Sequence, residues 1–108
     1  MKNLFSIEGK TAIITGGSSG IGAMIAEAFV QNGVKTYITS RKADILEEKC
    51  EEFSSNGKCI AIQSDLSNID GINRLFEEIC SYESKIDILI NNAGTAWASS
   101  FEDFPEKG

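Results

Sequence analysis

Four short stretches of the sequence combine β-branched and other apolar residues and end at turn-forming residues. They span residues 10–15, 34–39, 58–63 and 86–90. Runs of this length and composition predict strands. In the fourth run, Ile88, Leu89 and Ile90 place apolar side chains on both faces, which is typical of a strand inside a sheet rather than at its edge.

The segments between these strands have apolar residues at helical spacing. The first helix is expected over residues 19–32, with Gly33 in the position of a left-handed C-cap. The second begins at about Ala43 and has a glutamate-rich outer face. The third follows Ser67, a predicted N-cap with Asp70 three residues later. The residues expected to face inward are, helix by helix, Ile21, Ile25, Ala28 and Phe29; Leu46, Cys50 and Phe53; and Ile69, Ile72, Leu75, Phe76 and Ile79.

Strands and helices therefore alternate along the chain. Strands separated by helices of this kind imply parallel pairing through right-handed crossovers, with helices on both faces of the sheet. The sequence predicts an α/β fold with a Rossmann-type doubly wound parallel sheet, in the order β-α-β-α-β-α-β. Residues 95–108 have no clear periodicity.

Composition and charge narrow the classes of protein to which the chain can belong. The 108 residues are 42% hydrophobic, which is ordinary for a globular domain, and the formal net charge is -6. An acidic protein is poorly suited to bind nucleic acid or an anionic membrane surface. The N-terminus has no apolar signal region, and no run approaches the ~18 apolar residues that cross a bilayer. We therefore expect a cytoplasmic protein.

The absence of histidine and the spacing of the cysteines exclude several chemistries. A chain without histidine lacks the commonest metal ligand and the base of Ser-His-Asp and Cys-His systems. Cys50, Cys59 and Cys80 form no C-x-x-C pair and are interpreted as small core residues. We expect no metal site.

The glycine-rich segment between the first strand and the first helix carries the clearest chemical signal. Residues 15–22 read TGGSSGIG. Glycines at this place let the backbone turn sharply and approach a ligand closely, and the free amides of a helix start favour an anion. The segment therefore predicts a pyrophosphate site. Its T-G-x-x-x-G-x-G spacing lacks the lysine of a nucleoside triphosphate P-loop and differs from G-x-G-x-x-G.

Three motifs in order resemble those of the short-chain dehydrogenase/reductase family. They are the glycine turn, Asp65-Leu66 after the third strand, and NNAG at residues 91–94 after the fourth. The glycine spacing is similar to that of the compact branch of the family. Residues 5–22 and the run NNAGTAW at residues 91–97 look like those of NADP-dependent 3-oxoacyl-[acyl-carrier-protein] reductases, including the type that serves rhamnolipid synthesis.

This resemblance implies roles for residues of the glycine turn. Gly16, Gly20 and Gly22 would shape the pyrophosphate site. Ser18 and Ile21 would contact the cofactor, and Ile21 is expected to turn inward at the start of the helix.

The resemblance also implies an adenosine site at the ends of the third and fourth strands. Asp65 would accept a hydrogen bond from the adenine amino group, and the Leu66 backbone would lie beside it. Asn92, Ala93 and Gly94 would flank the adenosine ribose and brace the fourth strand against the turn. Asp65 could instead simply begin a helix, and Asn92 could be only a turn residue.

Cofactor choice depends on the end of the second strand. NAD-binding folds place an acidic residue about 20 residues beyond the glycines to hold the ribose 2′-hydroxyl. That position is Ser40, and Arg41-Lys42 follow it, which supplies donors and charge suited to a 2′-phosphate. The sequence therefore favours NADP (NADPH). Arg41 could instead be a solvated side chain, and Asp44 is an NAD-type alternative that falls inside the second helix.

No residue of the chain matches the catalytic groups that the resemblance implies, namely a serine and a Y-x-x-x-K pair. Tyr37 is followed at that distance by Arg41, and Tyr82 is followed three residues later by Lys85. We assign no catalytic residue, and we expect residues 1–108 to be the dinucleotide-binding portion of a single-domain reductase whose catalytic half is absent.

Three functions remain open on the sequence alone. The first is a fragment, inactive alone, of an NADP-dependent oxidoreductase that reduces a carbonyl or 3-oxoacyl substrate and is a homo-oligomer when full length. The second is a non-catalytic NADP-binding module, and the third is a remnant that no longer binds NADP. Trp97 and Phe101 could line the near edge of a substrate pocket or serve only in packing.

Overall fold

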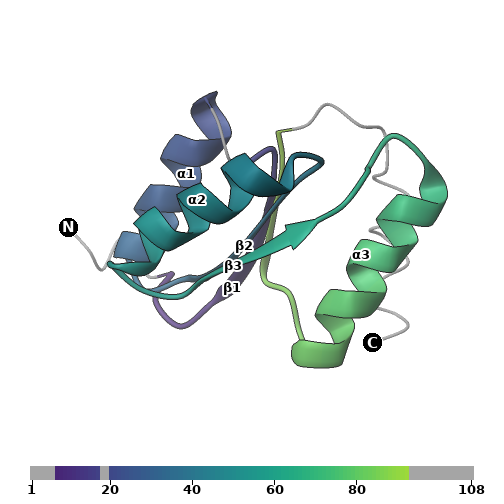
Figure 1. The fold of residues 1–108 in the computed structure, drawn as a ribbon. Helices are drawn as coiled ribbons and strands as arrows, with labels where there is room; N and C mark the ends of the chain where they lie inside the picture. The colour runs from purple at the N-terminus through teal and green to yellow at the C-terminus, as the bar shows by residue number, and fades with distance from the viewer. Residues whose placement is uncertain (1–6, 18–19, 93–108) are drawn as a thin grey trace.

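Strands and helices alternate in the predicted order (Figure 1). The computed structural model describes residues 7–17 and 20–92. The strands are β1 (Thr11–Thr15), β2 (Lys35–Ser40), β3 (Cys59–Gln63) and β4 (Ile88–Asn91). The helices are α1 (Gly20–Gln31), α2 (Ala43–Ser54) and α3 (Ile69–Tyr82).

The strands form one parallel sheet in the order β3-β2-β1-β4. Ile13 in β1 lies opposite Tyr37 in β2 and Leu89 in β4. Helices α1 and α2 cover one face of the sheet, and α3 covers the other (Figure 1). The predicted doubly wound α/β fold is therefore confirmed.

The core has two halves, one on each face of the sheet. Neighbouring residues of a strand point to opposite faces, so Ile13 packs toward α3 and Ile14 packs toward α1 and α2. Both side chains are fully buried. The buried residues on the α3 side are Ile13, Tyr37, Ile62, Leu66, Ile72, Leu75, Phe76 and Ile79. Those on the other side are Ile14, Ala26, Val30, Ile38, Leu46, Phe53 and Cys59.

Helix α1 turns a different face to the sheet from the one the sequence predicts. Its buried residues are Gly22, Ala26 and Val30, whereas Ile21 is 67% exposed and Ala28 is exposed. The cause is the tight packing of Gly22 against the Gly16 carbonyl, which turns Gly22 toward the sheet. Neighbouring helical residues are separated by about 100°, so Ile21 then points away from the sheet. The prediction of an inward Ile21 was wrong, although Ile25 and Phe29 do pack against the core.

Helix α3 begins one residue later than expected. Its N-cap is Asn68, whose side chain accepts a hydrogen bond from the Gly71 backbone N–H at 2.8 Å. The predicted cap, Ser67, instead donates to Asp65. Because of this start, Ile69 lies in the exposed first turn, with 55% of its surface accessible. The other four predicted inward residues of this helix are buried.

The three cysteines differ in environment. Cys59 is buried in the core, as predicted, and Cys50 is half-buried and packs against the same cluster. Cys80 is exposed on α3, so its interpretation as a core residue was wrong.

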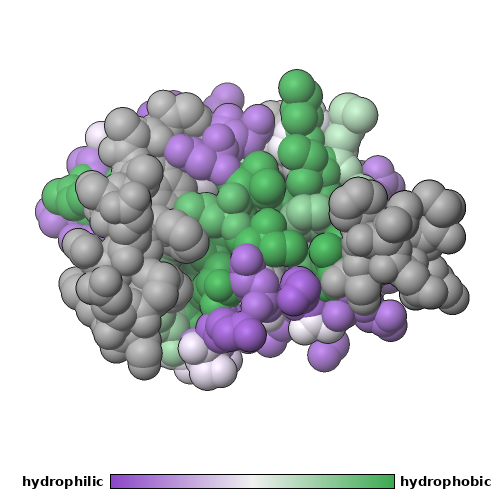
Figure 2. Space-filling model, turned by 180° about the vertical axis from the view of Figure 1, so that it is seen from behind, coloured by the Kyte–Doolittle hydropathy of each residue, from purple (hydrophilic) through white to green (hydrophobic). Residues whose placement is uncertain are grey.

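Strand β4 places apolar side chains on both faces of the sheet, as predicted. Leu89 packs toward the α3 side and Ile90 toward the α1 side, and both are half-buried. Among the described residues, β4 pairs with β1 alone. Figure 2 shows apolar side chains gathered on this face of the molecule, over β4 and part of α1. A position of β4 inside a larger sheet stays a prediction.

Candidate functional site

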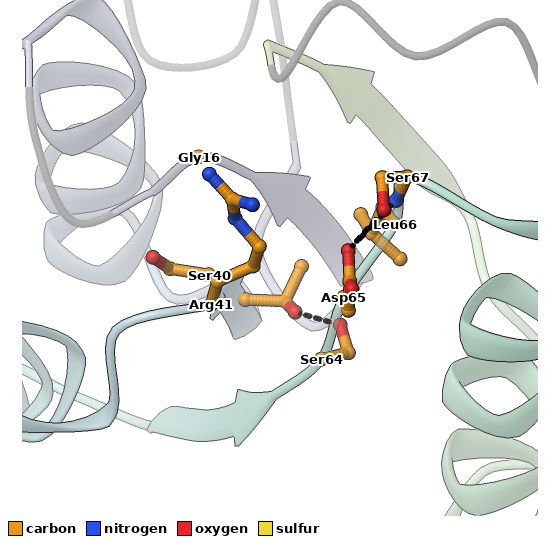
Figure 3. A pocket seen from close by; sticks show the side chains of 8 residues that line it. Gly16, Ser40, Arg41, Ser64, Asp65, Leu66 and Ser67 are labelled. Carbon is orange, nitrogen blue, oxygen red and sulfur yellow. Dashed lines mark hydrogen bonds between the residues drawn. The ribbon is translucent and has the colours of Figure 1, made fainter.

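The carboxyl ends of the first three strands open onto one hollow. Because the strands are parallel, their carboxyl ends meet at the same edge of the sheet, where open α/β sheets bind ligands. The hollow has a volume of 340 Å³. Its lining residues are Gly16, Thr39, Ser40, Arg41, Ser64, Asp65, Leu66 and Ser67 (Figure 3).

Two positions of the glycine turn favour glycine for different reasons, one for its backbone conformation and one for its close packing. Gly16 has a φ of 67°, in the left-handed region that favours glycine, and its N–H donates to the Thr39 carbonyl at 2.9 Å. A Cβ atom on Gly22 would collide with the Gly16 carbonyl oxygen and lie 2.7 Å from the Asn92 amide nitrogen. The turn, the start of α1 and the end of β4 are therefore held together by contacts that admit only glycine.

Arg41 lies between the end of β2 and the start of α2. Its side chain extends across the hollow toward Gly16 (Figure 3). The Ser40 hydroxyl accepts a hydrogen bond from the Lys42 N–H at 3.2 Å. Asp44, the NAD-type alternative, lies inside α2 and does not line the hollow. Arg41 therefore supplies positive charge where an acidic residue would bind a ribose hydroxyl.

Asp65 is the one carboxylate among the residues that line the hollow. Its Oδ1 atom accepts hydrogen bonds from the Ser67 hydroxyl at 2.6 Å and the Ser67 N–H at 3.0 Å. These two bonds hold the pKa of Asp65 below its ordinary value, and the positive charge of Arg41 acts in the same direction. Asp65 is therefore ionised at neutral pH. It lies ahead of the Asn68 cap, which contradicts the alternative that Asp65 begins the helix.

Asn92 joins the end of β4 to the glycine turn. Its N–H donates to the Thr15 hydroxyl at 2.9 Å, and its side-chain amide donates to the Gly16 carbonyl at 3.3 Å. The expected brace between the fourth strand and the turn is present in these bonds. Ser18, Ala93 and Gly94 lie outside the described residues, as do Trp97 and Phe101.

Four polar residues at this edge were not predicted as site residues, and one of them, Ser67, was predicted only as a helix cap. Thr39 and Ser64 share a hydrogen bond of 2.5 Å between their hydroxyls. Gln63 donates from Nε2 to the Arg41 carbonyl at 2.8 Å, and Ser67 orients Asp65. Thr39, Gln63 and Ser64 come together because of the register of β2 and β3, which sets Ser40 opposite Gln63.

Neither tyrosine of the chain lies at the hollow. The buried Tyr37 hydroxyl donates to Glu83 Oε2 at 2.6 Å, and burial together with this carboxylate raises the pKa of Tyr37 above its ordinary value. Tyr82 is exposed on α3, where its hydroxyl donates to Glu78 at 3.4 Å. The described part of the site therefore has charged and polar groups of the kind that can bind a ligand, and it offers no tyrosine as a proton donor.

No helix in the described ranges combines the length and the apolar composition needed to cross a bilayer.

The proteins that this chain resembles in sequence are dehydrogenases and reductases. The model of the family described as short chain dehydrogenase matches residues 10–108. A rhamnolipids biosynthesis 3-oxoacyl-[acyl-carrier-protein] reductase from Pseudomonas aeruginosa is 39% identical over 108 residues, which are 100% of this chain and 42% of that protein. An NAD-dependent glycerol dehydrogenase from Listeria innocua is 35% identical over 103 residues, 95% of this chain and 40% of that protein.

A solved structure agrees with the sequence matches. The Pseudomonas aeruginosa RhlG/NADP active-site complex superposes with a TM-score of 0.83 at 38% identity, over 96% of this chain and 42% of that one. The chain thus spans less than half the length of these relatives.

Proposed function

Because the chain belongs to the short-chain dehydrogenase family, we propose that the hollow binds the adenosine end of NADP(H), with Arg41 holding the 2′-phosphate. Relatives with either cofactor in their names match this chain, so family membership alone does not select NADP. The observation that carries the proposal is the position of Arg41 directly after β2, on the lining of the hollow. The one carboxylate on that lining, Asp65, follows β3 and not β2. A guanidinium offers a phosphate a planar fork of charged donors.

The remaining residues would hold the other parts of the dinucleotide. Gly16, Gly20 and Gly22 would shape the pyrophosphate turn, with Ser18 and Ile21 in contact with the cofactor. The exposure of Ile21 supports such a contact, because the side chain is free to meet a ligand.

The adenine and ribose would lie between the ends of β3 and β4. Asp65 Oδ1 is occupied by Ser67, so its second oxygen would accept from the adenine amino group, beside the Leu66 backbone. Ser40 would border the phosphate. Asn92, Ala93 and Gly94 would flank the ribose.

We further propose that residues 1–108 are the dinucleotide-binding portion of a longer, cytoplasmic, homo-oligomeric reductase. Its substrate class would be a carbonyl or 3-oxoacyl compound, which is supported by the identity to the Pseudomonas aeruginosa reductase. NADPH, when bound, would supply the hydride. The distance of both tyrosines from the hollow favours a second candidate for the chain by itself, a non-catalytic NADP-binding module.

A titration with two cofactors tests the role of Arg41. NADPH and NADH are titrated against the wild type, Arg41→Ala, and Arg74→Ala as a matched loss of an exposed arginine on α3. Charge-assisted hydrogen bonds contribute about 1.5–3 kcal/mol, so Arg41→Ala should raise the Kd for NADPH about 10- to 100-fold. The Kd for NADH should not change, and Arg74→Ala should resemble the wild type. A preference for NADPH that survives Arg41→Ala would overturn the proposal.

A further inference from the structure

The end of β2 and the residue after it are joined to the end of β3 by three hydrogen bonds. The Ser64 N–H donates to the Ser40 carbonyl at 3.0 Å, and the Ser64 and Thr39 hydroxyls are 2.5 Å apart. The first of these bonds joins the backbones at the last residue of β2, and the second joins side chains beside it. The third bond, from Gln63 Nε2 to the Arg41 carbonyl at 2.8 Å, reaches beyond the strand.

The third bond differs from the other two because it holds a residue that lies outside the strands. Residues 41 and 42 lie between β2 and α2, outside the ladder of strand hydrogen bonds. The Lys42 N–H is bonded to Ser40, and the Lys42 carbonyl accepts from Leu46 in the first turn of α2. The Arg41 carbonyl is held by the side chain of Gln63, which lies 22 residues away.

The position of this carbonyl affects where the guanidinium lies. The Arg41 side chain is long and extends over the hollow, so a rotation of its peptide unit displaces its charged end (Figure 3). Sites that hold phosphate by a planar fork depend on orientation as well as charge. A bond that fixes the backbone of Arg41 therefore leaves the guanidinium fewer orientations before the cofactor binds. Less conformational entropy is then lost when the guanidinium is ordered on the phosphate.

We propose that Gln63 is a positioning residue for cofactor choice, which acts by holding the Arg41 carbonyl so that the guanidinium meets the 2′-phosphate. This inference depends on the proposed function of Arg41. It assigns to β3 a part in distinguishing NADP from NAD, although Gln63 itself does not line the hollow.

Two substitutions of Gln63 and a control separate this role from a purely structural one. Gln63→Leu removes the donor at similar size, and Gln63→Glu keeps the length but presents a carboxylate to the carbonyl and to the phosphate. Gln31→Leu, at the exposed end of α1, is the matched control. Kd values for NADPH and NADH are measured for each variant, and also for Gln63→Leu combined with Arg41→Ala.

The expected result is a selective loss of NADPH binding. Gln63→Leu should raise the Kd for NADPH about threefold, at the lower end of the range for one hydrogen bond because the bond is exposed. Gln63→Glu should raise it further. The Kd for NADH should stay constant, which also reports that the variants are folded. In the Arg41→Ala background, Gln63→Leu should have no further effect on NADPH binding.

Each alternative result has a distinct meaning. If Arg41→Ala weakens NADPH binding but neither Gln63 variant changes the ratio of the two Kd values, the positioning role is wrong and the proposed function stands. An equal loss for both cofactors, or an undiminished effect of Gln63→Leu in the Arg41→Ala background, also overturns the positioning role. If Arg41→Ala leaves the ratio unchanged, the 2′-phosphate role of Arg41 fails, and the inference about Gln63 fails with it.

Discussion

Adding one methyl group at Gly22 should both destabilise the protein and disrupt the glycine turn. In an exposed helix, replacing glycine by alanine stabilises by about 1 kcal/mol. At Gly22 the new Cβ would collide with the Gly16 carbonyl oxygen and lie 2.7 Å from the Asn92 amide nitrogen. The Gly16 carbonyl is part of the backbone, and the Asn92 side-chain amide is held by its hydrogen bond to that carbonyl, so the new Cβ would disturb both groups.

The magnitude follows from the balance of these effects. Overpacking of a tight contact costs about 1–3 kcal/mol, and the gain in helix propensity offsets about 1 kcal/mol of this cost. We expect Gly22→Ala to lower the free energy of unfolding by up to about 2 kcal/mol on this balance. Displacement of the Gly16 carbonyl also moves the amides of the turn. The loss of one charge-assisted hydrogen bond between these amides and the pyrophosphate costs about 1.5–3 kcal/mol, so NADPH binding should weaken about tenfold or more.

Urea denaturation and an NADPH titration measure the two effects. Ala28→Gly, at an exposed position of the same helix, is the matched control. It should lower stability by about 1 kcal/mol through helix propensity alone and leave NADPH binding unchanged. A Gly22→Ala protein that is more stable than the wild type and binds NADPH normally would refute the reasoning from the contact with Gly16.

Two further predictions concern α3. Gly71→Ala should lower the free energy of unfolding by up to about 2 kcal/mol in urea denaturation, because a Cβ there would collide with the Asp65 carbonyl oxygen at a cost that exceeds the gain in helix propensity. The exposed Asn73→Ala is its control, and a stabilised Gly71→Ala protein would contradict this packing. The second prediction concerns pH and Glu83. Burial raises the pKa of Glu83, but bonds from Lys35 and Tyr37 more than offset it, so the net pKa is lowered. Glu83 therefore stabilises the fold above the unfolded pKa of about 4.3, and this stabilisation is lost as the pH falls through the lower folded pKa. Glu83→Gln should be less stable than the wild type at pH 7, with a difference that shrinks toward pH 3 in denaturation curves; a constant difference would disprove the linkage.

The strands and the glycine turn could be predicted from the sequence because their signals are local. β1 is a short run rich in β-branched residues that is followed by glycines, and β2 and β3 are also short runs with β-branched and other apolar residues. Arg41 could be found by counting from the glycines to the end of the second strand. The parallel sheet then follows from the alternation of strands and helices.

The N-cap of α3 and the inward face of α1 were predicted wrongly because the local sequence does not distinguish between neighbouring candidates. Ser67 and Asn68 are adjacent residues that can both cap a helix. Asp65 binds Ser67, and the cap is Asn68. The inward face of α1 was misjudged because its apolar periodicity does not reveal the contact between Gly22 and Gly16, which rotates Ile21 toward solvent.

The bonds that join the Arg41 carbonyl and Thr39 to the end of β3 could not be predicted because they depend on register. Gln63 and Arg41 are 22 residues apart, and Thr39 and Ser64 are 25 apart. They meet only because β2 and β3 pair with Ser40 opposite Gln63. No local pattern in the sequence contains that alignment.

The location of the cofactor is tested most directly by the backbone amide NMR spectrum of the ¹⁵N-labelled protein during titration with NADPH. If the carboxyl edge of the sheet is the site, the amide signals of Gly16, Arg41, Asp65 and Asn92 should shift together and saturate at one Kd. Those of Gly9, Gly33 and Gly57, which line a separate hollow at the opposite edge, should stay in place. Shifts confined to this opposite edge, or no saturable shift at the carboxyl edge, would contradict the assignment of the hollow as an NADP site.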